Sequence, residues 1–305
     1  MARHLFLQYV GMTEAAWMKQ GCPIEGMPFA DDVGSFEIFS LRALQTGLTD
    51  GGVKSTARPL TVRIRGDYAN NDLFDTSAMQ TRAGPQTMFQ IASNMDCLER
   101  PHCDTTLDDG FCCSVMEDDT QGPAGAGGAW AGMFGRVARC KREGINLLAN
   151  TGIPVRNGKI MPGKFPKIDV DDVCVGLQTD VRARYDRTCA PIKVVPDGPR
   201  IDQVYTSTVA QISKTPTALA EKLLAAAYAG TYLCAIRRRT KTLVLTVIGG
   251  GCFQNNYAQI AKALGDAHVK YSPYMAEGSE VILPLYAPND DFYTFIKAPH
   301  TVSKY

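Results

Sequence analysis

An apolar strand that runs straight into three consecutive glycines restricts the fold of this chain more than any other feature. Residues 242–248 are apolar and mostly β-branched, residues 249–251 are glycines, and a helical pattern starts at Tyr257. A run of this kind predicts a strand buried within a parallel sheet. Glycine lets backbone approach a ligand closely, and the N-terminus of the next helix offers free N–H groups. The pattern favours an anion-binding loop, although glycine turns after buried strands are also common without any ligand.

Strand and helix patterns alternate along the chain from residue 60 onward. The expected strands cover residues 61–65, 88–92, 172–180, 203–209 and 280–286. A long helix is expected to start at Thr215-Pro216, because threonine is a good N-cap and proline is favoured at the first helical position. This interleaving predicts an α/β domain with a largely parallel or mixed sheet.

Two segments outside this alternation have their own patterns. Residues 1–57 carry helix-like pieces at 13–18 and 36–48, and we expect an N-terminal extension packed on a main domain of residues 58–305. Residues 124–139 contain five glycines among apolar residues at helical spacing. Since each interior glycine costs a helix about 1 kcal/mol, so many of them predict close backbone contact with a neighbour or a ligand.

Composition excludes several classes of function. The chain has 305 residues, with 32 Lys and Arg against 31 Asp and Glu, so its formal charge of +1 favours neither nucleic acid nor a membrane surface as partner. Its ten cysteines have no CxxC spacing and its four histidines are scattered, so neither a metal nor a cofactor is expected. The N-terminal apolar run is too short for a signal peptide. We expect a cytoplasmic protein without a membrane span, and its oligomeric state stays open.

Five short motifs occur in an order that points to one family. A strand ends in Arg65-Gly66-Asp67, a second ends in residues 91–94 (Ile-Ala-Ser-Asn), and a glycine-rich segment covers residues 122–135. A helix containing residues 223–228 then leads into a strand and a second glycine loop at 248–253. In this order the segments resemble a macrodomain, the ADP-ribose-binding α/β fold. The resemblance covers residues 60–296 and implies a three-layer α/β/α domain with a mixed central sheet.

The resemblance is closest to a divergent branch of that family. The first glycine loop lacks the usual Gly-Gly-Gly-Val, and an acidic insertion lies between Cys103 and Asp119. Residues 90–94 and 120–123 look most like the arginine-type ADP-ribosyl hydrolases. The resemblance therefore implies ADP-ribose, or a protein carrying it, as the partner.

The resemblance also implies a set of ligand-binding residues. Strand-end residues would contact ribose, and backbone N–H groups of two loops would hold the diphosphate without basic side chains. These residues are Gln90, Ser93 and Asn94 at the strand end, Thr120, Gln121 and Gly122 in the first loop, and Gly249, Gly250, Gly251, Cys252, Phe253 and Asn255 in the second. Asn94 could equally be a turn residue, and Phe253 could equally be a core residue.

Four carboxylates are candidates for catalysis. Hydrolysis of a glycosidic bond is helped by carboxylates that stabilise an oxocarbenium-like state and position water, and a guanidinium leaving group pairs naturally with them. Asp180 is the first candidate, because it lies at the C-terminal end of a strand, where ligands of open α/β sheets bind. Asp172, Asp186 and Glu99 are the others, and each could instead be a turn or surface residue.

Two functions follow as alternatives. The first is an enzyme that binds ADP-ribose and hydrolyses its bond to a protein side chain, with arginine favoured. The second is a non-catalytic reader or sensor of ADP-ribose that uses the same loops. Another doubly wound nucleotide-binding family is disfavoured, since the chain has no glycine fingerprint after the first strand and no Walker-type motif.

Overall fold

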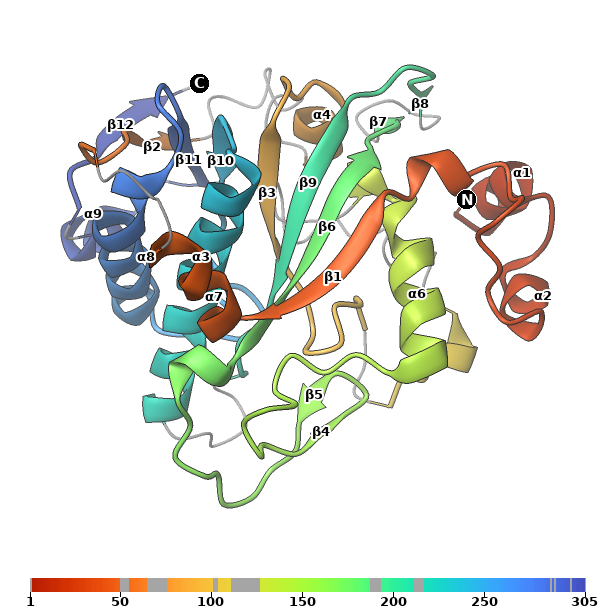
Figure 1. Ribbon diagram of the computed structural model, residues 1–305, viewed down its shortest axis with the longest axis horizontal. Helices are drawn as coiled ribbons and strands as arrows, with labels where there is room; N and C mark the ends of the chain where they lie inside the picture. Colours follow the sequence, from red (N-terminus) through yellow and green to blue (C-terminus); the bar gives the residue numbers. More distant parts are fainter. Residues whose placement is uncertain are drawn as a thin grey trace.

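A mixed eight-stranded sheet forms the centre of the molecule (Figure 1). The structure, a computed structural model, describes residues 2–49, 55–64, 76–100, 104–110, 127–186, 193–210, 217–285, 287, 289–296 and 298–304. The strands lie in the order β1-β6-β9-β3-β10-β11-β2-β12. Their bounds are β1 Ser35–Ser40, β2 Leu60–Ile64, β3 Thr87–Ala92, β6 Cys174–Arg182, β9 Arg200–Thr206, β10 Thr242–Val244, β11 Glu280–Leu285 and β12 Thr301–Lys304.

Strand direction defines two edges of this sheet. The neighbours from β9 to β12 pair in parallel, so their C-terminal ends lie together at one edge, the carboxyl edge. β6 pairs antiparallel with both β9 and β1, and its C-terminal end therefore lies at the opposite edge, the amino edge. The predicted buried parallel strand is confirmed, because β10 lies between β3 and β11 and is parallel to both.

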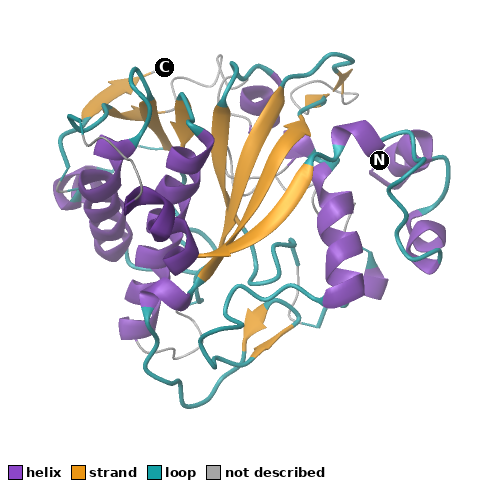
Figure 2. Ribbon diagram, viewed as in Figure 1, coloured by secondary structure: helices purple, strands orange, loops and turns teal. Residues whose placement is uncertain are grey.

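Helices cover both faces of the sheet, which completes three layers (Figure 2). One face carries α3 (Leu41–Thr49), α7 (Thr217–Arg238), α8 (Tyr257–Tyr271) and α9 (Asp290–Phe295), and the other carries α4 (Thr76–Thr81) and α6 (Gly132–Glu143). Alternation along β6 separates the faces: Val175 lies against Gly230 of α7, whereas Gln178 contacts Arg136 of α6. The predicted three-layer α/β/α architecture with a mixed central sheet is confirmed.

The long helix α7 is the core of the first face. Most of its positions from Leu219 to Ala235 are buried. Among the described helices it alone is long and apolar enough to cross a membrane, and 78% of its most apolar window is buried inside the fold. Such burial is what a central core helix requires, since a helix that is hydrophobic all round must be covered on every side. Its expected start at Thr215-Pro216 lies outside the described residues.

The N-terminal helices build a second hydrophobic cluster against α6. α1 (Ala2–Val10) and α2 (Glu14–Lys19, capped by Thr13) bring Phe6 and Trp17 against Trp130 and Phe134. The four side chains are fully buried. In Figure 1 these helices lie at the far end of the molecule from β12. The domain boundary at residue 57 stays a prediction.

One prediction in the N-terminal segment is wrong. Residues 36–48 were expected to be helical, but Ser35–Ser40 is the edge strand β1, paired with β6, and helix starts only at Leu41. Phe36 and Ile38 flank Glu37, a period of two that fits a strand better than a helix. The leucines at 41, 44 and 48 supply the helical spacing that dominated the pattern.

The glycines of the 124–139 segment meet protein neighbours. A Cβ at Gly128 would lie 2.7 Å from the Gln80 side chain, and one at Gly135 would lie 2.9 Å from Val33. At Gly132 the nearest atom would be Val181 Cγ2, at 3.0 Å. Close backbone packing is thus confirmed for the described part of this segment, and it brings α6 against the sheet.

Candidate functional site

Three chain segments leave neighbouring strands at the carboxyl edge and meet there. They follow β3, β9 and β10, the strands at the middle of the sheet. The Ser93 N–H donates to Thr206 O at 2.9 Å, which joins the ends of β3 and β9. The Ser93 hydroxyl, predicted as a ligand contact, donates to Asn94 O at 3.0 Å. In an open α/β sheet this edge is where ligands bind.

Residues 249–253, the glycine loop, present backbone N–H groups at this edge. No acceptor among the described residues receives the N–H groups of Gly251, Cys252 and Phe253. Gly251 and Cys252 are exposed, and Phe253 is half-buried. Asn256 follows as the N-cap of α8, so the positive end of that helix dipole lies beside the loop. Free N–H groups at a helix start are suited to an anion.

Gly249 is required by the shape of this loop. Its φ is +73°, in the left-handed region. A Cβ there would lie 2.4 Å from Asn255 Nδ2 and 2.6 Å from Thr208 Cγ2. At Gly250 the nearest atom to an added Cβ is Val247 Cγ1 at 2.7 Å, whereas Gly251 has open space around it. Gly251 is therefore the position where a side chain tests ligand binding without disturbing the loop.

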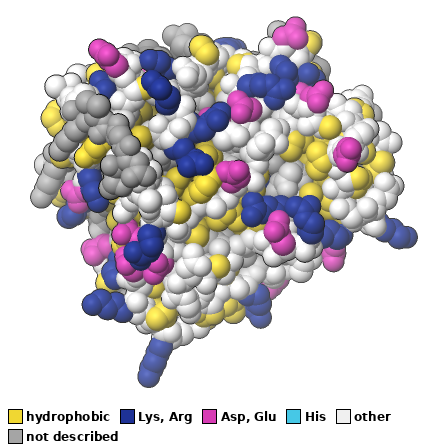
Figure 3. Space-filling model, viewed as in Figure 1, with side chains coloured by type: hydrophobic (Ala, Val, Ile, Leu, Met, Phe, Trp, Pro, Cys, Tyr) yellow, Lys and Arg dark blue, Asp and Glu magenta, His cyan; other side chains and the backbone are white. Residues whose placement is uncertain are grey.

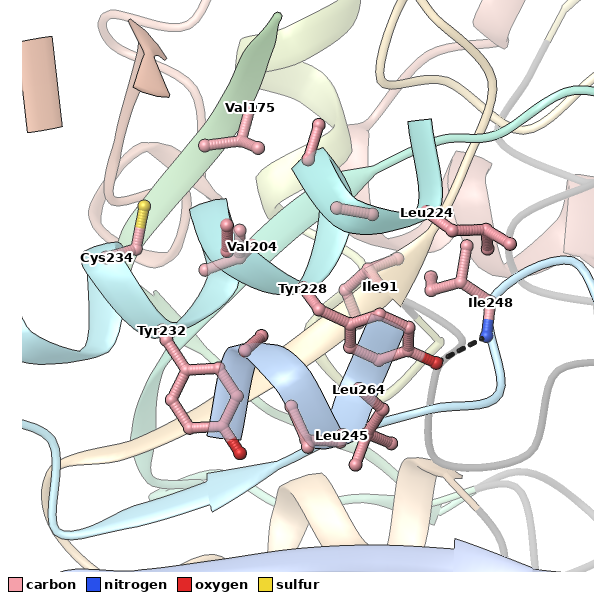
Figure 4. Packing of buried hydrophobic residues seen from close by; sticks show 14 of the residues in the cluster. Ile91, Val175, Val204, Leu224, Tyr228, Tyr232, Cys234, Leu245, Ile248 and Leu264 are labelled. Atoms are coloured by element: carbon pink, nitrogen blue, oxygen red, sulfur yellow. Dashed lines mark hydrogen bonds between the residues drawn. The ribbon is translucent and has the colours of Figure 1, made fainter. Parts of the chain in front are cut away.

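Two buried side chains hold the chain between β10 and the glycine loop. The Tyr228 hydroxyl in α7 donates to Thr246 O at 2.8 Å and accepts the Ile248 N–H at 3.3 Å, the contact drawn in Figure 4. Gln90 Oε1 in β3 accepts the Thr246 N–H at 3.1 Å, and its Nε2 donates to Ala227 O at 3.5 Å. Burial raises the pKa of Tyr228, so the hydroxyl stays protonated. Gln90, predicted as a ligand contact, thus supports the glycine loop from inside the core.

Two buried polar atoms behind the glycine loop lack partners among the described residues. Asn255 Nδ2 donates to Val209 O at 3.0 Å and to Gly249 O at 3.3 Å, which fixes the amide orientation and leaves Oδ1 without a donor. Thr208 Oγ1 is likewise buried and unpaired. Since buried polar groups are nearly always hydrogen-bonded, these atoms have unused capacity for a water or a ligand group.

Residues 94–98, the Asn94 turn, form the second part of the site. Asn94 donates twice to Leu98 O, from its backbone N at 3.2 Å and from Nδ2 at 3.0 Å, and Asn94 O accepts the Cys97 N–H at 3.0 Å. These bonds orient the side-chain amide. Within the described chain no donor reaches Asn94 Oδ1, so this oxygen can accept a hydrogen bond from a ligand hydroxyl.

A buried ion pair closes the Asn94 turn. Asp96 Oδ2 accepts Arg100 Nε at 2.7 Å, and both side chains are only 4% exposed. Asp96 Oδ1 accepts the Leu98 N–H at 3.3 Å. Burial raises the pKa of Asp96, and the Arg100 guanidinium opposes that shift. Removing either partner would leave an uncompensated buried charge, so the pair keeps this turn in one shape.

The hairpin of β4 (Val155–Arg156) and β5 (Lys159–Ile160) lies against the same turn. Asn157 and Gly158 form the turn of this hairpin, with φ values of 48° and 69°. Gly158 O accepts the Met95 N–H at 2.8 Å. A Cβ at Gly158 would lie 2.4 Å from Asp96 Oδ1, so the hairpin tip packs closely on the turn. In Figure 1 this hairpin lies beyond the carboxyl ends of the central strands.

The structure contradicts the placement predicted for Asp180. Because β6 runs antiparallel to β9, its C-terminal end is at the amino edge, across the sheet from Asn94. Asp180 Oδ2 pairs there with Arg238 NH2 at 3.1 Å, and Arg238 Nε pairs with Asp202 Oδ2 at 2.7 Å. The rule that ligands bind at C-terminal strand ends holds for the parallel strands, and the sequence pattern of β6 did not reveal its direction.

The other predicted carboxylates lie in three different places. Asp172 precedes β6 and accepts Arg42 NH2 at 2.9 Å on the outer surface of α3. Asp186 belongs to β7 (Tyr185–Asp186), which pairs with β8 (Lys193–Val194) beyond the amino edge. Glu99 directly follows the Asn94 turn and is half-buried. Of the four, Glu99 is therefore the one that shares a segment with Asn94. Thr120, Gln121 and Gly122 lie outside the described residues.

Sequence reasoning missed the residues that hold the site in place. Tyr228 was noted only as part of a motif, and Thr208, Arg100 and Arg136 were given no role. A tyrosine in a mostly apolar helix carries a hydroxyl that must find a partner when buried, and this was the available signal. Among the described residues no group of three His, Cys, Asp or Glu side chains could hold a metal ion.

Comparisons with known proteins match this chain by its fold and not by its sequence. No family model and no curated protein matches the chain. A poly(ADP-ribose) glycohydrolase from Thermomonospora curvata matches with a TM-score of 0.53 and 13% identity, over 88% of this chain and 86% of that one. The chain shares the fold of these glycohydrolases. A mutant of the Deinococcus radiodurans enzyme, solved in complex with ADP-ribose, matches with a TM-score of 0.51 and 11% identity, over 90% and 96% of the two chains.

Surface charge adds no competing site on the face that Figure 3 presents. Lys and Arg side chains lie interspersed with Asp and Glu there, in keeping with the formal charge of +1. A field of one sign would have indicated a polyanionic or polycationic partner. On this face no basic patch competes with the backbone N–H groups of the glycine loop as a place for an anion.

Proposed function

We propose that the chain binds ADP-ribose at the carboxyl edge and hydrolyses the bond between its terminal ribose and an attached group. The observation that carries this proposal is the meeting of two complementary groups at that edge. The glycine loop offers N–H donors for the diphosphate, and Asn94 Oδ1, one strand away, offers an acceptor for a ribose hydroxyl. The fold shared with poly(ADP-ribose) glycohydrolases supports the proposal.

Glu99 is the carboxylate that we propose for catalysis. Hydrolysis of a glycosidic bond requires a carboxylate near the reacting ribose. Because Glu99 follows the Asn94 turn, the ribose that Asn94 holds would be the reacting one, and the adenosine half would extend past the glycine loop. The role of arginine as the attached group stays a prediction, since Asp172 and Asp180, on which it rested, are paired with Arg42 and Arg238.

The alternative function is a reader that binds ADP-ribose without turnover. The observation that favours it is the engagement of Asp96, whose carboxylate is buried and bound to Arg100 within the Asn94 turn. Only Glu99 then supplies a candidate from the described part of the Asn94 segment. A reader would bind ADP-ribose through the same two groups.

One experiment separates these functions. The full chain is incubated with proteins mono-ADP-ribosylated on arginine, glutamate or serine and with poly(ADP-ribose), and released ADP-ribose is quantified by chromatography. Release from one or more substrates supports the hydrolase and identifies the bond. Binding of ADP-ribose by calorimetry, with no release from any substrate, replaces the hydrolase with the reader. Absence of both binding and release contradicts the proposal.

A further inference from the structure

Arg136 is a fully buried cation that forms no ion pair with any described carboxylate. It lies in α6 and is 1% exposed. Burial lowers its pKa, yet an arginine cannot be deprotonated in a protein. Placing a charge in the interior costs free energy unless hydrogen bonds and nearby polarisable groups compensate for it. A buried arginine at this position is therefore expected to have a specific structural or functional role.

The contacts of Arg136 compensate for the charge with neutral groups. Its Nε donates to Cys97 O at 3.0 Å, and NH1 donates to Gln178 Oε1 at 3.2 Å. The guanidinium carbon lies 3.9 Å from the centroid of the Tyr205 ring, a cation–π geometry. Gln178 in turn donates from Nε2 to Val33 O at 2.6 Å. The arginine thus connects α6, the sheet and the Asn94 turn through one rigid, planar group.

The Asn94 turn is the part of this network that belongs to the proposed ribose site. Cys97 O accepts from Arg136, and the Cys97 N–H donates to Asn94 O. Cys97 has a φ of 58°, a strained value for a residue with a side chain, so its peptide groups need external restraint to keep this shape. A charge-assisted hydrogen bond is about twice as strong as a neutral one, which makes a buried guanidinium an effective restraint.

We propose that Arg136 is a positioning residue that fixes the Asn94 turn from inside the fold, so that Asn94 Oδ1 is oriented toward the ribose. This inference rests on the proposed function for its ligand. The contact of Arg136 is with the backbone of the turn and not with the glycine loop. Replacing Arg136 should therefore weaken the binding of the ribose beyond the diphosphate and leave the binding of the rest of the ligand unchanged.

The test compares Arg136→Met and Arg136→Lys with Arg139→Met as the matched control. Arg139 lies on the same helix, donates to Phe36 O at 3.1 Å and pairs with Glu143, and among the described residues it makes no hydrogen bond or ion pair with the turn. Dissociation constants for ADP and for ADP-ribose are measured by calorimetry. We expect Arg136→Met to raise the dissociation constant for ADP-ribose by at least ~10-fold, as for loss of one positioned hydrogen bond, and to leave the dissociation constant for ADP at its wild-type value. Arg136→Lys should recover part of this loss, and Arg139→Met should change neither constant.

A ligand-free measurement keeps the inference separate from the proposed function. Amide hydrogen exchange compares the Asn94 and Cys97 N–H groups, which close the turn, with the Gln254 N–H, which donates to Gly251 O of the glycine loop. Both Arg136 variants should speed exchange at the turn by at least ~10-fold and leave Gln254 unchanged. Unchanged exchange at the turn, or an equal loss of ADP and ADP-ribose affinity, would overturn the role of Arg136. A wild-type protein that binds no ADP-ribose would contradict the proposed function, and exchange would still decide the role of Arg136.

Discussion

Replacing Tyr228 by phenylalanine removes one oxygen atom and tests whether the glycine loop depends on its buried support. The hydroxyl donates to Thr246 O and accepts from the Ile248 N–H, and both partners belong to the segment that leads into the loop (Figure 4). The phenyl ring would keep the apolar packing of α7. The variant therefore isolates the two hydrogen bonds from the side-chain volume.

The helix itself supplies a matched control. Tyr232, one turn further along α7, is also fully buried, and its hydroxyl lies 2.7 Å from His268 Nδ1. Tyr232→Phe removes the same atom from the same helix at a place that contacts α8 and not the glycine loop. Any difference between the two variants in ligand affinity then reports the loop and not the helix.

The expected costs follow from the number of partners left unpaired. Each buried partner left unpaired costs about 1–3 kcal/mol, so Tyr228→Phe, with two partners, should lower the free energy of unfolding by about 2–6 kcal/mol and Tyr232→Phe, with one, by about 1–3 kcal/mol. In a chain of this size each kcal/mol lowers the melting temperature by about 2 °C. If about 1.4 kcal/mol of the Tyr228 cost reaches the loop, ADP-ribose affinity falls ~10-fold.

Calorimetric titration with ADP-ribose and thermal unfolding decide the matter together. We expect both variants to melt a few degrees lower and only Tyr228→Phe to bind ADP-ribose more weakly. Equal ADP-ribose affinities in the two variants, with Tyr228→Phe destabilised at least as much as Tyr232→Phe, would refute the reasoning that the Tyr228 hydroxyl shapes the loop.

Three further predictions follow from the site and the core. Glu99→Gln should lower the rate of ADP-ribose release at least ~100-fold with little change in ADP-ribose affinity, which is the lower range for loss of an acid–base group. Asp180→Asn, at the amino edge, should leave the rate of release unchanged. Equal effects of the two substitutions in a turnover assay would contradict this assignment. Gly251→Glu should abolish ADP-ribose binding at an unchanged melting temperature, because it adds a negative charge in open space, and calorimetry that detects normal binding would show that the loop holds no anion. Burial lowers the pKa of His268 to about 4 in the folded protein. In the unfolded chain the same imidazole binds a proton below about pH 6.5. The contribution of the neutral imidazole to the free energy of unfolding is fully present above pH ~6.5 and is lost as the pH falls toward ~4. Between pH 7 and pH 4.5 this loss amounts to about 2 kcal/mol. His268→Gln should reduce this loss in denaturant unfolding at the two pH values, and an unchanged loss would contradict the assignment to His268.

Local patterns predicted the elements of this fold well. The apolar run before Gly249 gave a buried parallel strand, and the alternation of strands with helices gave the three layers, because burial on both faces leaves a clear mark on a sequence. The strand β10 ends at Val244, four residues before the expected end. The Leu245 N–H still donates to Ile282 O of β11, but from Thr246 onward the backbone bonds to the side chains of Tyr228 and Gln90. The edge strand β12 was missed, and its exposed Val302 shows why a short edge strand leaves a weak pattern.

The candidate site was only partly predictable. Asn94 and the glycine loop follow strands directly, so their common edge could be inferred from the order of the chain. The side of the sheet to which Asp180 belongs depends on the direction of β6, which is fixed by pairing with β9 and β1 and not by local sequence. The contact of Arg136 with Cys97 O joins segments that are distant in the sequence, and the contact of Asp96 with the Leu98 N–H depends on the shape of the turn. Residue types alone predict neither contact.

The central claim, that ADP-ribose occupies the glycine loop, can be tested at Cys252. This thiol is exposed in the loop, whereas the thiols at residues 22, 97, 140, 174 and 234 are buried or half-buried. The rate of alkylation of Cys252 is followed by peptide mass spectrometry with no ligand, with AMP and with ADP-ribose. We predict that saturating ADP-ribose slows the modification of Cys252 at least ~10-fold and that AMP, which lacks the diphosphate and the second ribose, has little effect. Equal rates with and without ADP-ribose, at concentrations that saturate binding in calorimetry, would contradict the claim.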